Sequence, residues 1–432
     1  MKKLISLGLL VLLVAISPYF IGQQAETQVR NIYSKISDST GYELEVTEYH
    51  RGWWHSNATV VVKVPMPAQY GTDFKYLTFT SLQEIQHGPI LFKADGLGLG
   101  VADIEYQINL PEQLTAILPN ELAIPENTLQ IMSRLAFNGD IDSTTHLKAF
   151  DLTVDNALLS VKEAKFSSAI SVTGAMTVTG NWQGFTISED NIDVLSMTDM
   201  NITSKQQIIR GEVFSQYALS TGDVLIDIAE MKIYDLTTAT QMSNSNSKIK
   251  LVSSEHNDLL TIDALISSNK IQVIDNQYND FNYQVTLANL DIDAFQEMQK
   301  IMVQAQELPE QERMMAFMQI QSLLPKMIAK NPEFTIKQLG LNTANGAIAS
   351  AMNFHFDQTI YDPQNPMSLI MAVNAQAQGE APKAFFTEIG KADDLNEYIS
   401  QGLLIEENEN VMFEFSFVNG QALLNGMPIP LG

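Results

Sequence analysis

The feature that most constrains the fold is an alternation of apolar and polar residues that repeats along most of the chain. Apolar residues occupy every second position within segments such as 42–46, 224–228 and 260–266. Turn-forming clusters, such as 179–181 and 243–246, separate these segments. Because successive side chains of a strand point to opposite faces, this period of two predicts strands with one apolar face. Strands joined by short turns indicate an antiparallel sheet, so we expect a meander.

Helical segments interrupt the strand pattern in three places. The sequence predicts a short helix over 111–118, two helices within 293–329 that are broken near Pro309, and a further helix over 385–399. The expected fold class is therefore mainly β with α (α+β). It comprises an N-terminal transmembrane helix, followed by an elongated, curved antiparallel β-sheet domain with a few helical insertions.

The transmembrane helix is expected from the first residues of the chain. Lys2 and Lys3 precede a run without charge over residues 4–21, which at 18 residues is near the lower limit for crossing a bilayer. A retained anchor and a cleaved signal peptide both remain open. The anchor is favoured because Pro18 would follow the best cleavage site. The two lysines would then keep the N terminus in the cytoplasm.

Three regions follow from these patterns. Residues 1–22 form the anchor or an uncleaved signal. Residues 23–39 form an amphipathic helical stalk, because apolar residues from Ala25 to Ile36 follow a spacing of four, three and four. Residues 40–432 form one large β-rich domain with a helical insertion around 293–329.

The charge and the absence of cysteine exclude several classes of function. Fifty acidic residues against 25 basic residues give a formal net charge of −25. Nucleic acid is therefore not an expected partner, since phosphate binding needs a basic surface. The chain contains no cysteine, which excludes disulfides, thiol catalysis and cysteine metal sites.

No motif indicates an enzyme. The closest pair of histidines, His50 and His55, lacks the spacing of a helical zinc site. No G-x-S-x-G motif is present, and no Lys-Ser or Lys-Thr pair follows the glycines of 96–100. We expect no catalytic residue, no metal site and no cofactor.

Two short motifs resemble those of a known family. The first is similar to the Y-x-R-G-W-[FW]-x-S-x-A motif of YdgA-like proteins and comprises Tyr49, Arg51, Gly52, Trp53, Trp54, Ser56 and Ala58. The second resembles the H-G-P motif of the same family and comprises His87, Gly88 and Pro89. The resemblance implies a Gram-negative protein of the inner membrane, with a single transmembrane pass and its main domain in the periplasm. It brings no assigned activity.

A more distant resemblance concerns architecture alone. Strand-turn-strand units behind one anchor are similar to AsmA-like envelope proteins, which build β-grooves for lipids. Fold does not determine function, so this resemblance implies a groove only as an expectation.

Two sets of side chains have competing interpretations. Of Trp53 and Trp54, one ring is expected in the core and the other at the surface, because adjacent strand residues face opposite sides. The helical pair is rich in methionine, which packs adaptably in cores and also lines apolar binding surfaces. These methionines either cover the sheet or line an apolar groove, and they are Met298, Met302, Met314, Met315, Met318 and Met327.

Two functions remain open from the sequence. The first is a membrane-anchored periplasmic protein that binds or passes an apolar ligand, a lipid, along a β-groove. The alternative is a scaffold that acts through protein contacts at the inner membrane, as a homo-oligomer or with other envelope proteins. The inner membrane itself would be contacted through residues 4–21. A continuous apolar face favours the first function, and a filled core with a flat apolar patch favours the second.

Overall fold

The computed structural model describes residues 2–40, 42–65, 76–92, 96–109, 125, 127–306, 310–362 and 364–429. Within these ranges, the side chains of 2–16, 39, 40, 109, 306, 310–312 and 366 lie outside the described part. The helix expected over 111–118 also lies outside the described residues. The chain forms two compact units. Unit 1 comprises Met1–Asp193 and Thr198–Ser220, and unit 2 comprises Val194–Met197 and Thr221–Gly432.

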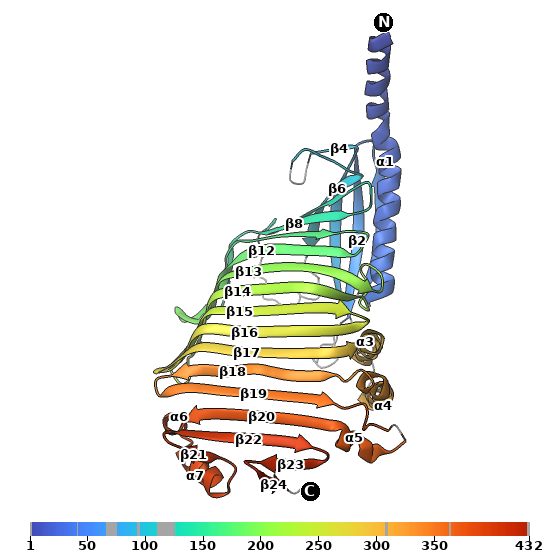
Figure 1. Cartoon of the computed structure of the whole chain (residues 1–432). Helices are drawn as coiled ribbons and strands as arrows, with labels where there is room; N and C mark the ends of the chain where they lie inside the picture. The colour runs from blue at the N-terminus through green and yellow to red at the C-terminus, as the bar shows by residue number, and fades with distance from the viewer. Residues whose placement is uncertain are drawn as a thin grey trace. The chain divides into compact units, whose positions relative to one another are not determined.

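Unit 1 combines one long helix, α1 (Lys2–Thr40), with an antiparallel sheet (Figure 1). Its strands pair in the order β1 (Glu43–Arg51), β2 (His55–Pro65), β3 (Tyr76–His87), β6 (Ala102–Asn109), β7 (Leu129–Leu135), β8 (Ile141–Leu147), β11 (Ala164–Ile170), β12 (Ala175–Glu189), β10 (Ala157–Val161) and β9 (Phe150–Val154). A separate pair joins β4 (Ile90–Leu91) to β5 (Gly98–Leu99). The long strand β13 (Ile192–Arg210) follows β12, and its residues from Thr198 onward belong to unit 1.

The core of unit 1 lies between α1 and the sheet. Ala25 and Val29 on α1 are fully buried against Ala58, Ile85 and Ile104 on three neighbouring strands. The apolar stripe that the sequence places on 23–39 thus faces the sheet. Packing of one apolar helix face on one sheet face is the usual way to bury both.

Unit 2 is a meander in which each strand pairs with the next along the chain. In the order of pairing the strands are β14 (Leu219–Asp235), β15 (Thr240–His256), β16 (Leu259–Val273), β17 (Asn276–Asp291), β18 (Glu333–Thr343), β19 (Gly346–Phe356), β20 (Val373–Pro382), β22 (Asn410–Val418), β23 (Gln421–Leu424) and β24 (Met427–Ile429). The short β21 (Ile405–Glu407) also pairs with β22. All these pairings are antiparallel, as the alternating pattern predicts.

The helices of unit 2 lie at the ends of its strands (Figure 1). The segment expected to form two helices contains α3 (Ile292–Gln306) and α4 (Glu310–Ile328), which pack on each other and on β17. The helix expected over 385–399 is divided into α6 (Lys383–Glu388) and α7 (Ala392–Ser400). Gly390 lies between them with a φ of +74° and interrupts the helical backbone. The short helix α5 (Pro366–Ala372) is not among the helices expected from the sequence.

The expected N-terminal transmembrane helix is contradicted. In the parts of the chain with described structure, no helix is both long enough and apolar enough to cross a membrane. This finding corrects the expected fold class, and it equally contradicts the single-pass inner-membrane localisation. Where its side chains are described, α1 buries several of its apolar residues, including Pro18, Ala25 and Val29, within the protein. Most of the 4–21 run, from residue 4 to residue 16, has side chains outside the described part.

Candidate functional site

The two motifs singled out in the sequence meet beside α1. Ser56 on β2 and His87 at the end of β3 are joined by a hydrogen bond of 2.8 Å between Ser56 Oγ and His87 Nε2. The backbone N–H of His87 donates to the carbonyl oxygen of Trp54, at 2.8 Å. Gly22 of α1 lies against the imidazole ring, so closely that a Cβ there would be 2.5 Å from His87 Nδ1. The motif residues therefore help to seat α1 on the sheet.

The motif glycines permit close backbone contacts. Gly52 donates its N–H to the carbonyl oxygen of His55 at 2.9 Å, and a Cβ on Gly52 would lie 2.5 Å from that oxygen. A Cβ on Gly88 would lie 1.7 Å from the carbonyl oxygen of Gly100. Both turns exclude a side chain, which explains why glycine occupies these positions.

The charged and aromatic residues of the motif also contact side chains of α1. The Arg51 guanidinium lies 3.6 Å from the Glu26 carboxylate and 5.6 Å from the centre of the Tyr19 ring. The Tyr19 and Trp53 rings are 5.6 Å apart between centres. Trp53 is 50% exposed and Trp54 is 39% exposed, so neither ring lies in the core as expected for one of them.

Three further motif residues complete this region. Tyr49 on β1 lies directly opposite Ala58 on β2, and burial raises the pKa of the Tyr49 hydroxyl. Ala58 is 3% exposed and belongs to the core beneath α1. Pro89 accepts a hydrogen bond through its carbonyl oxygen from the N–H of Gly100, at 3.2 Å.

The hydrogen-bonded serine and histidine do not present a nucleophile to a substrate. A hydroxyl next to an imidazole is the pairing that serine catalysis requires. Here Ser56 is 2% exposed and His87 is fully buried. Burial also lowers the pKa of His87, which favours the neutral ring. Metal chemistry has no evident location either, since the described residues contain no group of three His, Asp or Glu side chains that could hold an ion.

The six methionines of α3 and α4 differ in exposure. Met298 and Met327 are partly buried. Met302 is 51% exposed, and on α4 Met314, Met315 and Met318 are 71%, 54% and 61% exposed. The same helix buries Ala316, Leu323 and Ile328. Most of these methionines thus face outward, rather than filling a core between helix and sheet.

A continuous apolar row crosses the sheet of unit 2. Residues that lie directly opposite each other on paired strands share one face of the sheet. Following these partners from β14 to β23 gives a row, here called the apolar row, with an apolar residue on every strand that it crosses. Its members are Val224, Leu251, Ala264, Val285, Ile336, Met352, Ala377, Phe415 and Leu424.

Rows on either side of the apolar row widen it into an apolar face. One flanking row consists of Ile226, Ile249, Ile266, Tyr283 and Leu339. The other consists of Ile262, Leu287, Phe334, Phe354, Ala375, Phe417 and Ala422. Several of these side chains are accessible: Ile249 and Ile266 are each 42% exposed, Leu251 is 39% exposed and Leu339 is 37% exposed.

The opposite face of the same sheet is polar. Asp263 accepts hydrogen bonds from Thr286 Oγ1 at 2.5 Å and from Lys337 Nζ at 3.0 Å. Thr286 and Lys337 together hold the pKa of the Asp263 carboxyl below its usual range. Next to this cluster, Asn353 Nδ2 donates to Thr335 Oγ1 at 2.9 Å. Unit 2 therefore separates apolar and polar side chains onto the two faces of one sheet.

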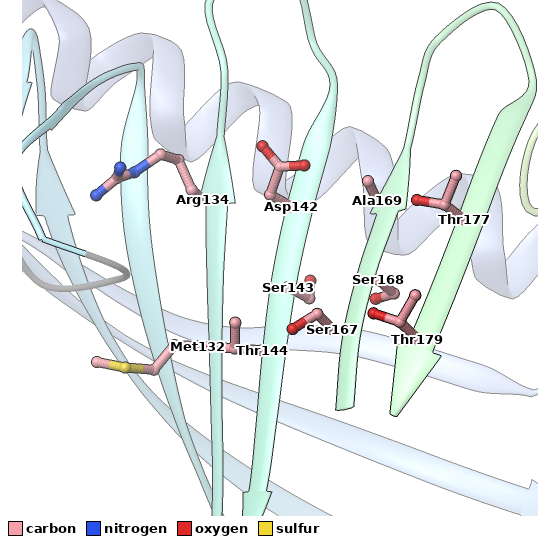
Figure 2. A pocket seen from close by; sticks show the side chains of 10 residues that line it. All are labelled: Met132, Arg134, Asp142, Ser143, Thr144, Ser167, Ser168, Ala169, Thr177 and Thr179. Atoms are coloured by element: carbon pink, nitrogen blue, oxygen red, sulfur yellow. The ribbon is translucent and has the colours of Figure 1, made fainter. Parts of the chain in front are cut away.

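A small polar pocket lies on the sheet of unit 1 (Figure 2). It has a volume of about 240 Å³ and is lined mainly by hydroxyl groups from β8, β11 and β12. Thr144, Ser167 and Thr179 lie directly opposite one another across these strands. At its edge, Arg134 forms a two-point ion pair with the buried Asp103, at 2.8 and 2.9 Å. This pocket was not predicted from the sequence, although the Ser and Thr residues at 143–145 and the alternate threonines Thr177 and Thr179 mark it.

Comparison with known proteins identifies the family. A family model described as "Bacterial protein of unknown function (DUF945)" matches residues 1–432, so the chain belongs to this bacterial family. Neither a curated protein nor a solved structure matches the chain. The arrangement of the apolar face, rather than a relative, is therefore the basis for a functional proposal.

Proposed function

We propose that this member of the DUF945 family binds an elongated apolar ligand of the lipid class along the apolar face of unit 2. The observation that supports the proposal is the apolar row, which holds an apolar residue on every strand that it crosses from β14 to β23. A binding role without catalysis fits this surface, because it offers contact area and no reactive group.

The dimensions of the row suit a hydrocarbon chain. Nine strands at a spacing of about 4.8 Å give the row a length of roughly 38 Å. The hydrocarbon core of a bilayer, which contains two opposed chains, is about 30 Å thick. A single acyl chain, which spans about half of that thickness, is therefore shorter than the row and can lie along it in full.

The exposure of the face supports a ligand rather than a permanent covering. Contiguous apolar surface beyond a few hundred Å² is uncommon on soluble monomers and marks interaction sites. Each methylene removed from water on such a face contributes about 0.8 kcal/mol. The resemblance of the strand pattern to AsmA-like β-grooves, an expectation from the sequence, agrees with this proposal.

The test compares two neighbouring residues on opposite faces of β16. Ile266 belongs to the apolar face, and Ser267 lies on the polar face next to it. Ile266→Lys introduces a charge beside the apolar row, whereas Ser267→Lys introduces the same charge on the other side. Lipids that co-purify with each protein are then identified by mass spectrometry, and binding of a fluorescent fatty acid is titrated.

We expect both variants to keep the melting temperature of the parent chain, since Ile266 is 42% exposed and a lysine there can reach water. Ile266→Lys should lose the lipid and weaken the titrated binding, while Ser267→Lys should retain both. Equal binding by the two variants, or a parent chain that never carries lipid, would contradict the proposal.

A second candidate function, protein–protein contact, is favoured by the outer surface of α4. Met314, Phe317 and Met318 are 71%, 70% and 61% exposed on one side of this helix. Methionine and aromatic side chains are frequent at protein interfaces. If this surface mediates self-association, light scattering should detect an oligomer for the parent chain and a monomer for Met318→Glu. A parent chain that is monomeric at high concentration would exclude the homo-oligomer.

A further inference from the structure

Unit 1 contains a second cavity, of about 660 Å³, that lies apart from the polar pocket. It is lined by α1, by the connection between β7 and β8, by the turn between β11 and β12, and by the end of β13 with the segment after it. This volume is within the range of about 300–1,000 Å³ that is usual for small-molecule sites.

About half of the lining is apolar, and its charged residues are mainly positive. Apolar side chains come from all four parts, and they include Ile32, Ile141, Ile170, Ile208, Val213 and Phe214. Lys35 and Arg210 add two positive charges, against one negative charge from Glu212. The chain as a whole has twice as many acidic as basic residues, so this local excess of cations is opposite to the overall composition.

Hydrogen bonds hold the walls of the cavity in place. The backbone N–H of Ile208 on β13 donates to the carbonyl oxygen of Gly174, at 2.9 Å, and thereby ties β13 to the turn between β11 and β12. The same turn is tied to the connection after β7, because the N–H of Val172 donates to Asp140 Oδ1 at 2.9 Å. This bond is the main reason why the pKa of the Asp140 carboxyl is lowered. Three of the four segments that bound the cavity are thus fixed to one another.

We propose that this cavity binds a single-chain anionic amphiphile. Its hydrocarbon chain would lie against the isoleucine side chains, and its carboxylate or phosphate head group would lie beside Lys35 and Arg210. A cation that donates a hydrogen bond to an anion makes one of the stronger polar contacts in proteins. The proposal concerns unit 1 and does not depend on a ligand at the apolar face of unit 2.

The test uses three probes with the same twelve-carbon chain: dodecanoate, dodecyl phosphate and dodecanol. Isothermal titration with the full chain, below the concentrations at which the probes self-associate, gives a Kd for each. We expect at least one anionic probe to bind more tightly than dodecanol. The tighter binder of dodecanoate and dodecyl phosphate identifies the preferred head group.

Variants separate the head-group contact from the chain contact. Arg210→Gln and Lys35→Gln should each weaken binding of the anionic probe by about tenfold and leave dodecanol unchanged. Lys165→Gln is the matched control, since Lys165 belongs to unit 1 but does not line the cavity. Val172→Trp should fill the cavity and weaken all three probes, and Val172 is 57% exposed, so the variant should fold.

Two results would overturn the proposal. One is dodecanol binding as tightly as both anions, with no effect of Arg210→Gln. The other is unchanged binding of the anions to folded Val172→Trp. Ile266→Lys distinguishes this cavity from the apolar face of unit 2. Probe binding at the cavity should be lost in Val172→Trp and kept in Ile266→Lys. Binding that is lost in Ile266→Lys alone belongs to the sheet of unit 2.

Discussion

A side chain at position 52 would collide with the backbone of its own turn. The Gly52 Cβ position lies 2.5 Å from the carbonyl oxygen of His55, which is nearer than atoms of this kind approach without rearrangement. The restriction is steric, since the φ angle of Gly52 is not among those in the left-handed region. Close backbone approach is one of the few reasons why glycine becomes obligatory at a position.

Gly52→Val should therefore destabilise unit 1. We expect a loss of about 1–3 kcal/mol in the free energy of unfolding, which is the usual range for a substitution that displaces backbone. Urea denaturation followed by fluorescence measures the loss. His50→Ala is the control, because the His50 side chain is 77% exposed. An unchanged unfolding midpoint for Gly52→Val would show that the turn can adapt.

His87 should make stability depend on pH. Burial lowers the pKa of His87 in the folded chain, whereas in the unfolded chain the imidazole titrates near its ordinary value of about 6.5. Between the folded and unfolded pKa values, the unfolded state binds more protons, so stability rises with pH across this window. Stability is therefore lost as the pH falls below the unfolded value, and the loss levels off below the folded value.

His87→Gln should remove this component, since an amide does not titrate. We expect the melting temperature of the variant to fall less steeply than that of the parent chain as the pH is lowered from neutral toward acid. His50→Gln serves as the exposed comparison and should keep the parental slope. Parallel curves for the parent chain and His87→Gln would contradict the role assigned to burial of His87.

At the scale of single elements, α4 has two apolar surfaces, one buried in the protein and one exposed. Ala316 and Leu323 are 6% and 8% exposed, whereas Met314 and Met318 on the outer side are largely exposed. The helix is thus not amphipathic in the usual sense, in which the outer face is polar. An apolar outer face favours a contact with another molecule over a purely structural cover.

The two sides of α4 should respond differently to the same substitution. Leu323→Glu places a charge at a position from which water is largely excluded, which costs several kcal/mol or prevents folding. Met318→Glu should change the free energy of unfolding by no more than about 0.5 kcal/mol, as is usual for exposed positions. Circular dichroism during chemical denaturation tests both. A similar loss in the two variants would mean that Met318 is covered.

At the scale of the whole molecule, unit 2 is built by adding strands one after another. Apart from the short β21, each strand from β15 to β23 pairs with its neighbours in sequence, and β24 pairs with β23. Contacts in such an arrangement are mainly between neighbours, as in repeat proteins, so local stability depends on the strands at either side. A short strand at the end of the series has the fewest contacts.

Hydrogen exchange should reflect this gradient. Backbone amides in β24 and β23 should exchange before those in β16 and β17, because terminal strands open without disturbing the rest of the sheet. Mass spectrometry of peptides from exchange time courses measures the order. Uniform protection across all strands of unit 2 would show that the unit unfolds only as a whole.

The sequence alone determined the local features of this protein. The period of two located the strands and divided their side chains between two faces, because alternation depends only on the backbone of each strand. Turn residues such as Asn419 and Gly420, both with positive φ, marked the hairpin between β22 and β23. The glycine motifs indicated tight turns, and Gly52 forms one.

The tertiary structure decided everything that depends on residues distant in sequence. Ser56 and His87 are 31 positions apart and meet through strand pairing. The sequence could not place the α4 methionines outward, because an apolar residue looks the same in a sequence whether its side chain is buried or exposed. The hydrophobic effect is not directional, so the apolar character of a residue does not say which surface it contacts. The apolar row and the unit 1 cavity therefore emerged only when register and packing brought their separate segments together.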